Sequence, residues 1–223
     1  MERRVVVTGL GAITPIGNNV EDYWKSLKEG KCGIDTITAF DISDFKVKLA
    51  AEVKNYNAEE YLDKRSAKRL DRFAQFAIIA AREAMKDSGI TKENTDMDRV
   101  GTFIGSGMGG LETIEKESEV CCTKGYDRIS PMYIPMVISN MAAGNVAIDL
   151  GLRGESFSIA TACASATHSI GEAYRAIKHG YQDVVFTGGT EAAISKTGIS
   201  GFTNIKALSK KKNKNRASIP FDK

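Results

Sequence analysis

The sequence predicts an α/β architecture in which helices cover a largely parallel sheet. Short runs of apolar and β-branched residues end in glycine, which is typical of buried strands, and stretches with helical apolar periodicity lie between them. Parallel strands need a crossover connection, which a helix normally supplies. No internal repeat or low-complexity linker divides the chain, so we expect one large domain.

Four segments are predicted to be strands. The first is a run of three valines closed by Gly9, and the last is followed by Gly188 and Gly189. The predicted strands cover residues 4–8, 100–104, 157–162 and 183–187.

Five segments are predicted to be helices. The longest carries apolar residues at intervals of three and four, among them Phe73, Ala77 and Ile78, and glycines mark several helix ends. Residues 32–57 show no clear period. The predicted helices cover residues 20–30, 58–89, 111–120, 133–150 and 164–179.

Composition excludes several classes of protein. The net charge is +3, but the run between Lys210 and Arg216 holds five basic residues, so the rest of the chain carries a net −2. A general nucleic-acid surface needs a broad basic face, and none is indicated. No apolar stretch approaches ~18 residues, which argues against a membrane partner.

The cysteines indicate neither a metal site nor a disulfide framework. The chain has four cysteines, Cys32, Cys121, Cys122 and Cys163, with no CxxC spacing and only two histidines to assist them. Free thiols suit a reducing compartment, so we expect a cytoplasmic protein.

Cys163 lies where a predicted strand runs directly into a predicted helix. The first N–H groups of a helix and its dipole stabilise an anion, so this position favours a thiolate. The same N–H groups can donate to a carbonyl oxygen that gains negative charge during attack. The neighbours Ala160, Ala162, Ala164 and Ala166 are small and leave room for an acyl group on sulfur. From spacing alone, a small buried hydrophobic residue is the competing interpretation.

The two histidines are expected to be structural. His168 is five residues after Cys163, which places it about 140° away around a helix. His179 is expected at the helix end, where a positive charge is favourable. The sequence therefore offers a nucleophile without an evident histidine partner.

A glycine pattern after the second predicted strand has the letters of a dinucleotide fingerprint. It runs from Gly105 to Gly110, but Glu112 would put a carboxylate where the pyrophosphate belongs. We therefore expect tight strand-to-helix turns here, with a nucleotide-binding domain as the less favoured alternative.

With these motifs in place, the chain resembles the amino-terminal half of a β-ketoacyl-[acyl carrier protein] synthase of the elongating, type II kind. The matching motifs occur in the family's order from one end of the sequence to the other. They are residues 5–17 (VVVTGLGAITPIG), 104–110 (IGSGMGG), 129–131, 151–154, 159–168 (IATACASATH), 188–191 (GGTE), 201–202, 207–209 and 220–222.

The resemblance implies a thiolase-like layered fold, with a mixed, largely parallel five-stranded sheet in residues 1–223 and the second half outside this sequence. It implies no cofactor. Cys163 would accept an acyl group from acyl carrier protein, and the carbanion formed by decarboxylation of the malonyl carrier would then attack the thioester. Two histidines and a second oxyanion N–H would come from the other half, so we expect this chain alone to be inactive in condensation.

Further roles follow from the resemblance. Met108, Ala162 and Phe202 would line the acyl pocket, and the family implies a homodimer. The acidic carrier protein would meet a group of basic residues, Arg65, Lys68, Arg69 and Lys206. A solvated helix face is the competing interpretation of the basic run, but five basic residues between Lys64 and Arg72 favour a patch that faces an anionic partner. A non-catalytic module that only holds carrier protein is the alternative to an enzyme.

Overall fold

The computed structural model describes residues 3–222, which form two compact units. Unit 1 contains residues 3–11 and 57–192, and unit 2 contains residues 12–56 and 193–222. Within the described residues, no helix is both long enough and apolar enough to cross a bilayer.

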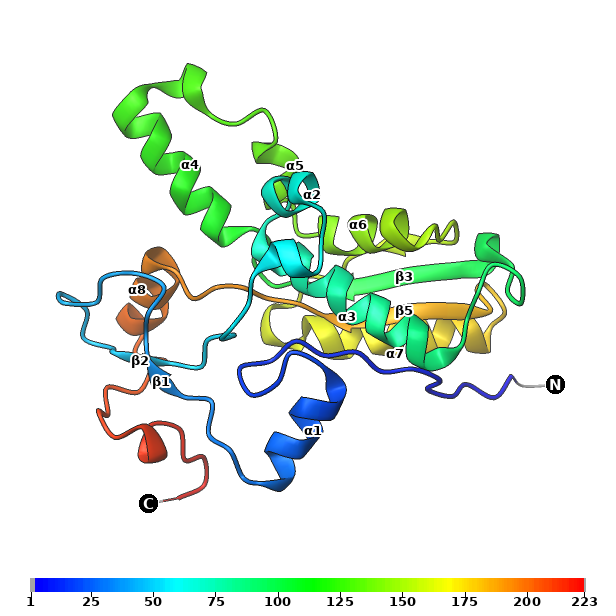
Figure 1. Cartoon of the computed structure of the whole chain (residues 1–223), viewed down its shortest axis with the longest axis horizontal. Coiled ribbons are helices and arrows are strands. Elements are labelled where there is room, and N and C mark those ends of the chain that lie inside the picture. Colours follow the sequence, from blue (N-terminus) through cyan, green and yellow to red (C-terminus); the bar gives the residue numbers. More distant parts are fainter. Residues whose placement is uncertain (1–2, 223) are drawn as a thin grey trace. The chain divides into compact units, whose positions relative to one another are not determined.

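Unit 1 is a three-layer α/β structure around a parallel sheet (Figure 1). In the described residues this sheet has three strands in the order β4 (Ser156–Phe157), β3 (Val100–Gly105) and β5 (Val184–Gly189). Both pairings are parallel, with Phe103 aligned to Phe157 on one side and to Thr187 on the other. The α/β class is thus confirmed, but the sheet has fewer strands than the five expected.

Three helices of unit 1 cover the two faces of this sheet: α3 (Arg72–Ser88) and α6 (Met141–Leu150) on one face and α7 (Ser165–Lys178) on the other. The helices α2 (Lys64–Arg69), α4 (Leu111–Lys124) and α5 (Tyr133–Val137) lie away from the strands, and α4 projects outward (Figure 1).

Strand β3 is buried on both sides, and its alternating side chains join two different cores. Val100 and Ile104 face the larger core, which is built mainly from α3 and α6. Phe103 faces the opposite way and packs against Ala173 and Ala176 of α7. This two-residue alternation is what a strand between two helical layers requires.

The long helix predicted over residues 58–89 is broken into α2 and α3. Leu70 is extended, and the carboxylate of Asp71 accepts the backbone N–H of Phe73 at 3.2 Å as the N-cap of α3. The helix predicted over 133–150 is divided in the same way, because Ile138 is extended between α5 and α6.

The first predicted strand is wrong. Residues 4–8 form no ladder in the described part of the chain, and Val6 and Val7 are 55% and 80% exposed. The segment is tethered at its ends, where Arg3 pairs with Asp183 at 2.7 Å and the Leu10 N–H donates to Asp87 at 2.9 Å. A run of valines has high strand propensity, but propensity alone does not supply a pairing partner.

Unit 2 contains α1 (Val20–Lys28), the antiparallel pair β1 (Asp35–Thr36) and β2 (Leu49–Ala50), and α8 (Lys196–Asn204). The predicted helix over 20–30 is confirmed as α1, whereas β1, β2 and α8 had no clear sequence signal. The core of unit 2 is small, with Ile37, Val47 and Ile199 buried.

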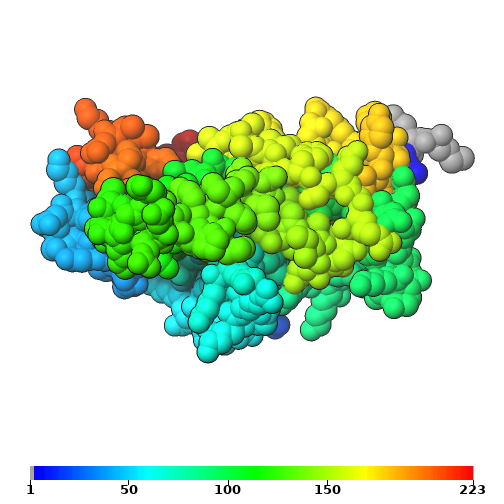
Figure 2. Space-filling model, turned by 90° about the horizontal axis from the view of Figure 1, so that it is seen from above, coloured from blue at the N-terminus to red at the C-terminus, as the bar shows by residue number. Residues whose placement is uncertain are grey.

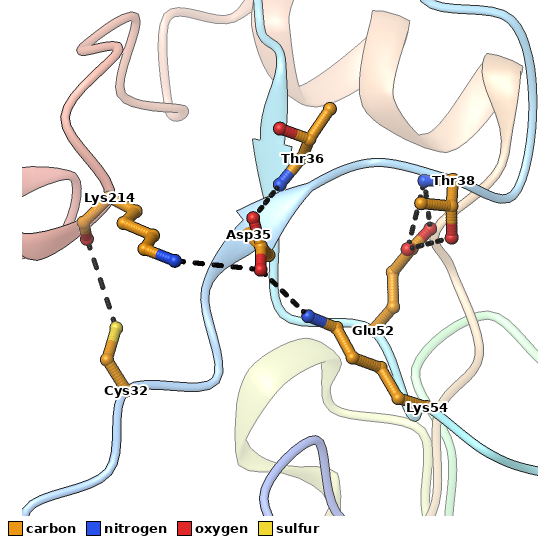
Figure 3. A network of polar contacts seen from close by, with 7 residues as sticks. All are labelled: Cys32, Asp35, Thr36, Thr38, Glu52, Lys54 and Lys214. Carbon is orange, nitrogen blue, oxygen red and sulfur yellow. Dashed lines mark hydrogen bonds and ion pairs between the residues drawn. The ribbon is translucent and has the colours of Figure 1, made fainter.

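Polar contacts support the loops of unit 2 (Figure 3). The Asp35 carboxylate lies 3.2 Å from the Lys54 ammonium and 3.8 Å from that of Lys214. The buried Glu52 carboxylate accepts the N–H of Thr38 at 3.0 Å, and it also accepts the N–H of Ala39 at 3.0 Å.

Candidate active site

Cys163 lies in a short 3₁₀ turn, Ala162–Ala164, that leads directly into α7. Its side chain is exposed, so the interpretation as a buried hydrophobic residue is wrong. The strand predicted over 157–162 is confirmed only at Phe157, where β4 ends, and the chain between there and the turn has no regular structure. The cysteine therefore stands at the N-terminal end of a helix, as the sequence indicates.

The turn before Cys163 is strained and braced by side chains. Ala162 has a φ of +52°, which is unfavourable for a residue with a Cβ. The buried Ser165 hydroxyl accepts the N–H of Thr161 at 2.9 Å and donates to the carbonyl of Ala162 at 2.7 Å. Next to it, Thr161 Oγ1 lies 2.8 Å from Nδ1 of His168. His168 thus has a structural role in the turn, which agrees with the sequence argument.

Two glycines let the first turn of α7 sit against the ends of β3 and β5. A Cβ at Gly105 would lie 2.6 Å from the carbonyl carbon of Ser165, and one at Gly189 would lie 2.5 Å from Cβ of Ala166. Real Cβ atoms do not approach so closely. These glycines therefore fix where Cys163 is presented, at the carboxyl ends of the strands, where α/β folds place their sites.

The turn after β3, residues 105–110, carries Met108 and lies beside the cysteine turn. A Cβ at Gly107 would lie 3.4 Å from the carbonyl oxygen of Ala162. The structure thus brings the Met108 turn, Ala162 and Cys163 together within unit 1. Phe202 belongs to α8 in unit 2 and is partly exposed.

Glu191 was missed by the sequence analysis although its carboxylate organises this turn. Oε2 accepts the backbone N–H of Gly107 at 2.8 Å and that of Met108 at 3.2 Å. Burial raises the pKa of Glu191, and the two N–H donors oppose that rise. Its position in the motif GGTE after a strand was the only available signal.

The same contacts weaken the nucleotide interpretation. In a phosphate-binding glycine turn the backbone N–H groups face the ligand. Here those of Gly107 and Met108 already bind a carboxylate, and the N–H of Gly109 binds the Ser106 hydroxyl at 3.0 Å. An anionic phosphate would compete with an anion that is already in place.

The predicted basic surface is partly gathered on one helix. Arg65, Lys68 and Arg69 are exposed on α2, whereas Lys206 belongs to unit 2. Within the described residues none of these three α2 side chains, nor that of Lys64 on the same helix, forms an ion pair.

A groove of about 280 Å³ adjoins the basic surface (Figure 2). α2, in cyan, forms one side, and the green-to-yellow α5 and α6 form the other. Arg65 and Arg69 line it together with apolar side chains, including Leu62 and Ile148.

The fold and the turn around Cys163 define an α/β protein that presents an exposed thiol at the N-terminal end of a helix. Comparison with known families identifies the protein family, because residues 2–223 match the model of the beta-ketoacyl synthase, N-terminal domain. The chain belongs to this family.

Named relatives agree with that assignment. The chain is 47% identical over 219 residues to 3-oxoacyl-[acyl-carrier-protein] synthase 2 of Staphylococcus aureus, covering 98% of this chain and 53% of the relative. It is 45% identical over 223 residues to the protein of the same name from Synechocystis sp., covering 100% of this chain and 54% of the relative. The chain thus spans about half the length of these relatives.

Solved structures show the same fold. A ketosynthase/chain length factor for ishigamide matches with a TM-score of 0.87 and 27% identity, over 94% of this chain and 52% of that one. A beta-ketoacyl synthase from Burkholderia phymatum matches with a TM-score of 0.84 and 25% identity, over 99% of this chain and 54% of that one. The thiolase-like fold expected from the resemblance is therefore confirmed.

Proposed function

We propose that this chain supplies the acyl-accepting cysteine of a 3-oxoacyl-[acyl carrier protein] synthase in fatty acid biosynthesis. The observation that carries the proposal is the exposed Cys163 in a strained, braced turn at the start of α7. The names of the relatives support the substrate class.

The proposed reaction has two stages. In the first, the Cys163 thiolate attacks the carbonyl carbon of an acyl carrier thioester, a C–S bond to Cys163 forms, and the carrier leaves as its thiol after taking a proton. In the second, malonyl carrier loses CO₂, and the carbanion forms a C–C bond with the acyl carbon while the Cys163 thiolate is released. The backbone N–H of Cys163 is suited to stabilise the oxyanion in both stages.

Acyl transfer to a single thiol tests this proposal. We expect the purified chain, incubated with a fatty acyl carrier thioester, to gain one acyl mass on the peptide that contains Cys163. Cys163→Ala should gain none, whereas Cys122→Ala, which removes another exposed thiol, should behave like the unchanged protein. An adduct that persists in Cys163→Ala would contradict the proposal.

Complete condensation is expected to need groups outside this sequence. The resemblance places two histidines and a second oxyanion donor in the other half of the family fold. We therefore predict no measurable malonyl decarboxylation or ketoacyl product from the chain by itself. Robust turnover would refute this part of the proposal.

We further propose that acyl carrier protein docks on α2. Four exposed cations on one short helix, Lys64, Arg65, Lys68 and Arg69, suit an acidic partner, and none of them forms an ion pair within the described residues. Arg65→Glu combined with Lys68→Glu should weaken carrier binding by roughly tenfold or more, since each rim charge pair is worth up to about 1 kcal/mol. Lys116→Glu, on the exposed face of α4, is the matched control.

The alternative is a module that binds carrier protein without chemistry. The two functions differ in their dependence on the thiol. A module would retain carrier binding in Cys163→Ala and would never become acylated, whereas the proposed enzyme half loses the adduct in that variant.

A homodimer is also proposed. β4 is an edge strand of the sheet, and its Phe157 is partly exposed while stacking on Phe103 with ring centroids 4.0 Å apart. Open edges with apolar side chains favour pairing with a second copy. Sedimentation of Phe157→Glu against the unchanged chain would test this, with a shift toward monomer expected. The four free thiols support the proposed cytoplasmic location.

A further inference from the structure

The turn that carries Met108 is held from a distant part of the chain. Glu191, two residues after β5, accepts the N–H groups of Gly107 and Met108 on one oxygen, and its other oxygen lies 3.4 Å from the Ser106 hydroxyl. That hydroxyl in turn accepts the N–H of Gly109 at 3.0 Å. A single carboxylate thus connects four consecutive residues of the turn, either directly or through Ser106.

A second carboxylate holds the segment that follows this turn. Asp71, which is 3% exposed, accepts both the N–H and the hydroxyl of Thr113, at 3.0 and 2.6 Å, in the first turn of α4. The turn is therefore fixed at both ends, by Glu191 at Gly107 and Met108 and by Asp71 at Thr113. Charge repulsion from Asp71 contributes to the raised pKa of Glu191.

The clamped turn lies between the Glu191 carboxylate and the residue before Cys163. The Cβ position of Gly107 is 3.0 Å from Oε2 of Glu191 and 3.4 Å from the carbonyl oxygen of Ala162. A displacement of the turn away from Glu191 must break its hydrogen bonds to that carboxylate, and it also changes the position of the turn relative to the residue before Cys163. Met108 itself is 41% exposed, so packing around its side chain does not fix it and the backbone must.

We propose that Glu191 is a positioning residue which holds Met108 against the Cys163 turn and thereby sets the length of chain that can react at Cys163. This inference rests on the proposed function, because it concerns which acyl groups reach that thiol. Glu191 touches no reacting atom and acts only through the backbone of Gly107 and Met108. A purely structural Glu191 would affect stability without changing selectivity for chain length.

The test uses the whole chain and two readouts. The first is hydrogen exchange at the amides of Gly107 and Met108. The second is the ratio of the rates at which iodoacetamide and its N-octyl derivative alkylate Cys163. For Glu191→Ala we expect exchange at least about tenfold faster, because a hydrogen bond to a charged acceptor is lost, and a ratio changed at least about threefold. Glu191→Gln keeps the size and one acceptor oxygen, so smaller changes in the same direction are expected.

Glu52→Gln is the matched control. Glu52 likewise accepts two successive backbone N–H groups, but it is buried and belongs to unit 2. Its replacement should leave both readouts at Gly107, Met108 and Cys163 unchanged.

Each outcome decides the inference. An unchanged rate ratio in both Glu191 variants, or unprotected Gly107 and Met108 amides in the unaltered chain, would overturn it. The second of these measurements needs no variant and so survives any failure of the variants to fold. If both readouts change but no acyl carrier thioester ever acylates Cys163, the positioning role stands and the proposed function fails.

Discussion

Glu52 and Glu191 make the same kind of hydrogen bonds to backbone N–H groups, but in different surroundings. Each carboxylate accepts two successive backbone N–H groups from an earlier loop, 13 and 14 positions before Glu52 and 84 and 83 positions before Glu191. Glu52 secures a loop in a unit whose buried core is small, with Ile37, Val47 and Ile199 at its centre. Glu191 secures a turn beside Cys163 in a unit with an extensive core. A carboxylate that binds a loop in this way has only a structural role where the loop carries no site residue, and it can affect function where the loop lies beside the site.

The largest expected effect is the loss of stability when a core side chain of either unit is truncated. Phe73 is fully buried in unit 1, so Phe73→Ala should lower the free energy of unfolding by about 3–5 kcal/mol. Ile199→Ala removes fewer atoms from a smaller cluster and should cost closer to ~2 kcal/mol. Denaturant titration of both variants measures the difference. Equal losses would show that the two cores contribute alike and would break the comparison.

A second prediction concerns glycines near the site. Gly105→Ala would place a Cβ 2.6 Å from the Ser165 carbonyl carbon, so α7 must shift, at a cost of about 1–3 kcal/mol. Alkylation of Cys163 by iodoacetamide should slow accordingly. Gly171→Ala, also on α7, meets nothing within 4 Å and should raise stability by ~0.5–1 kcal/mol without slowing alkylation. Similar effects of the two substitutions would show that the glycine end of β3 does not position the cysteine.

The smallest expected effect is a difference in pH dependence between two carboxylates of unit 1. Hydrogen bonds from Arg99 and Arg3 lower the pKa of Asp183 from 3.8 to about 2, so its stabilisation is present above pH 3.8 and is lost as the pH falls toward 2. Because Asp183 is largely exposed, the loss should stay below about 1 kcal/mol.

Glu191 should change stability with pH in the direction opposite to Asp183. Its pKa is raised above 4.5, so its contribution to stability is present below pH 4.5 and is lost as the pH rises through the raised value. Urea titrations between pH 2 and 7 should show that Asp183→Asn flattens the slope of stability against pH only in the acid limb, below pH 3.8, and that Glu191→Gln flattens it only in the limb above pH 4.5. A profile in which both variants alter the same limb would contradict the assigned causes.

Elements with strong local signals were predictable from the sequence. The apolar stripe of α3, the buried run of β3 and the glycine after α6 correspond to elements of the structure. Their hydrophobic period and end residues are encoded within a few positions. Cys163 at the start of α7 was predictable for the same reason.

Features that depend on contacts between distant residues were not predictable. The valines of residues 4–8 have strand propensity, but no strand pairs with them in the described chain. The break before α3 depends on Asp71, which serves both as an N-cap and as a partner of Thr113. Glu191 reaches residues more than eighty positions earlier in the sequence, and no local pattern indicates such a contact.

The central claim is that the turn into α7 makes Cys163 a nucleophile, and thiol labelling tests it most directly. Cys32 and Cys122 are also exposed, so exposure alone predicts similar labelling of these three residues. We predict that brief iodoacetamide treatment followed by peptide mapping will label Cys163 several times faster than Cys32, Cys121 or Cys122, because only Cys163 lies at the start of a helix. Equal labelling of the exposed thiols would contradict the account.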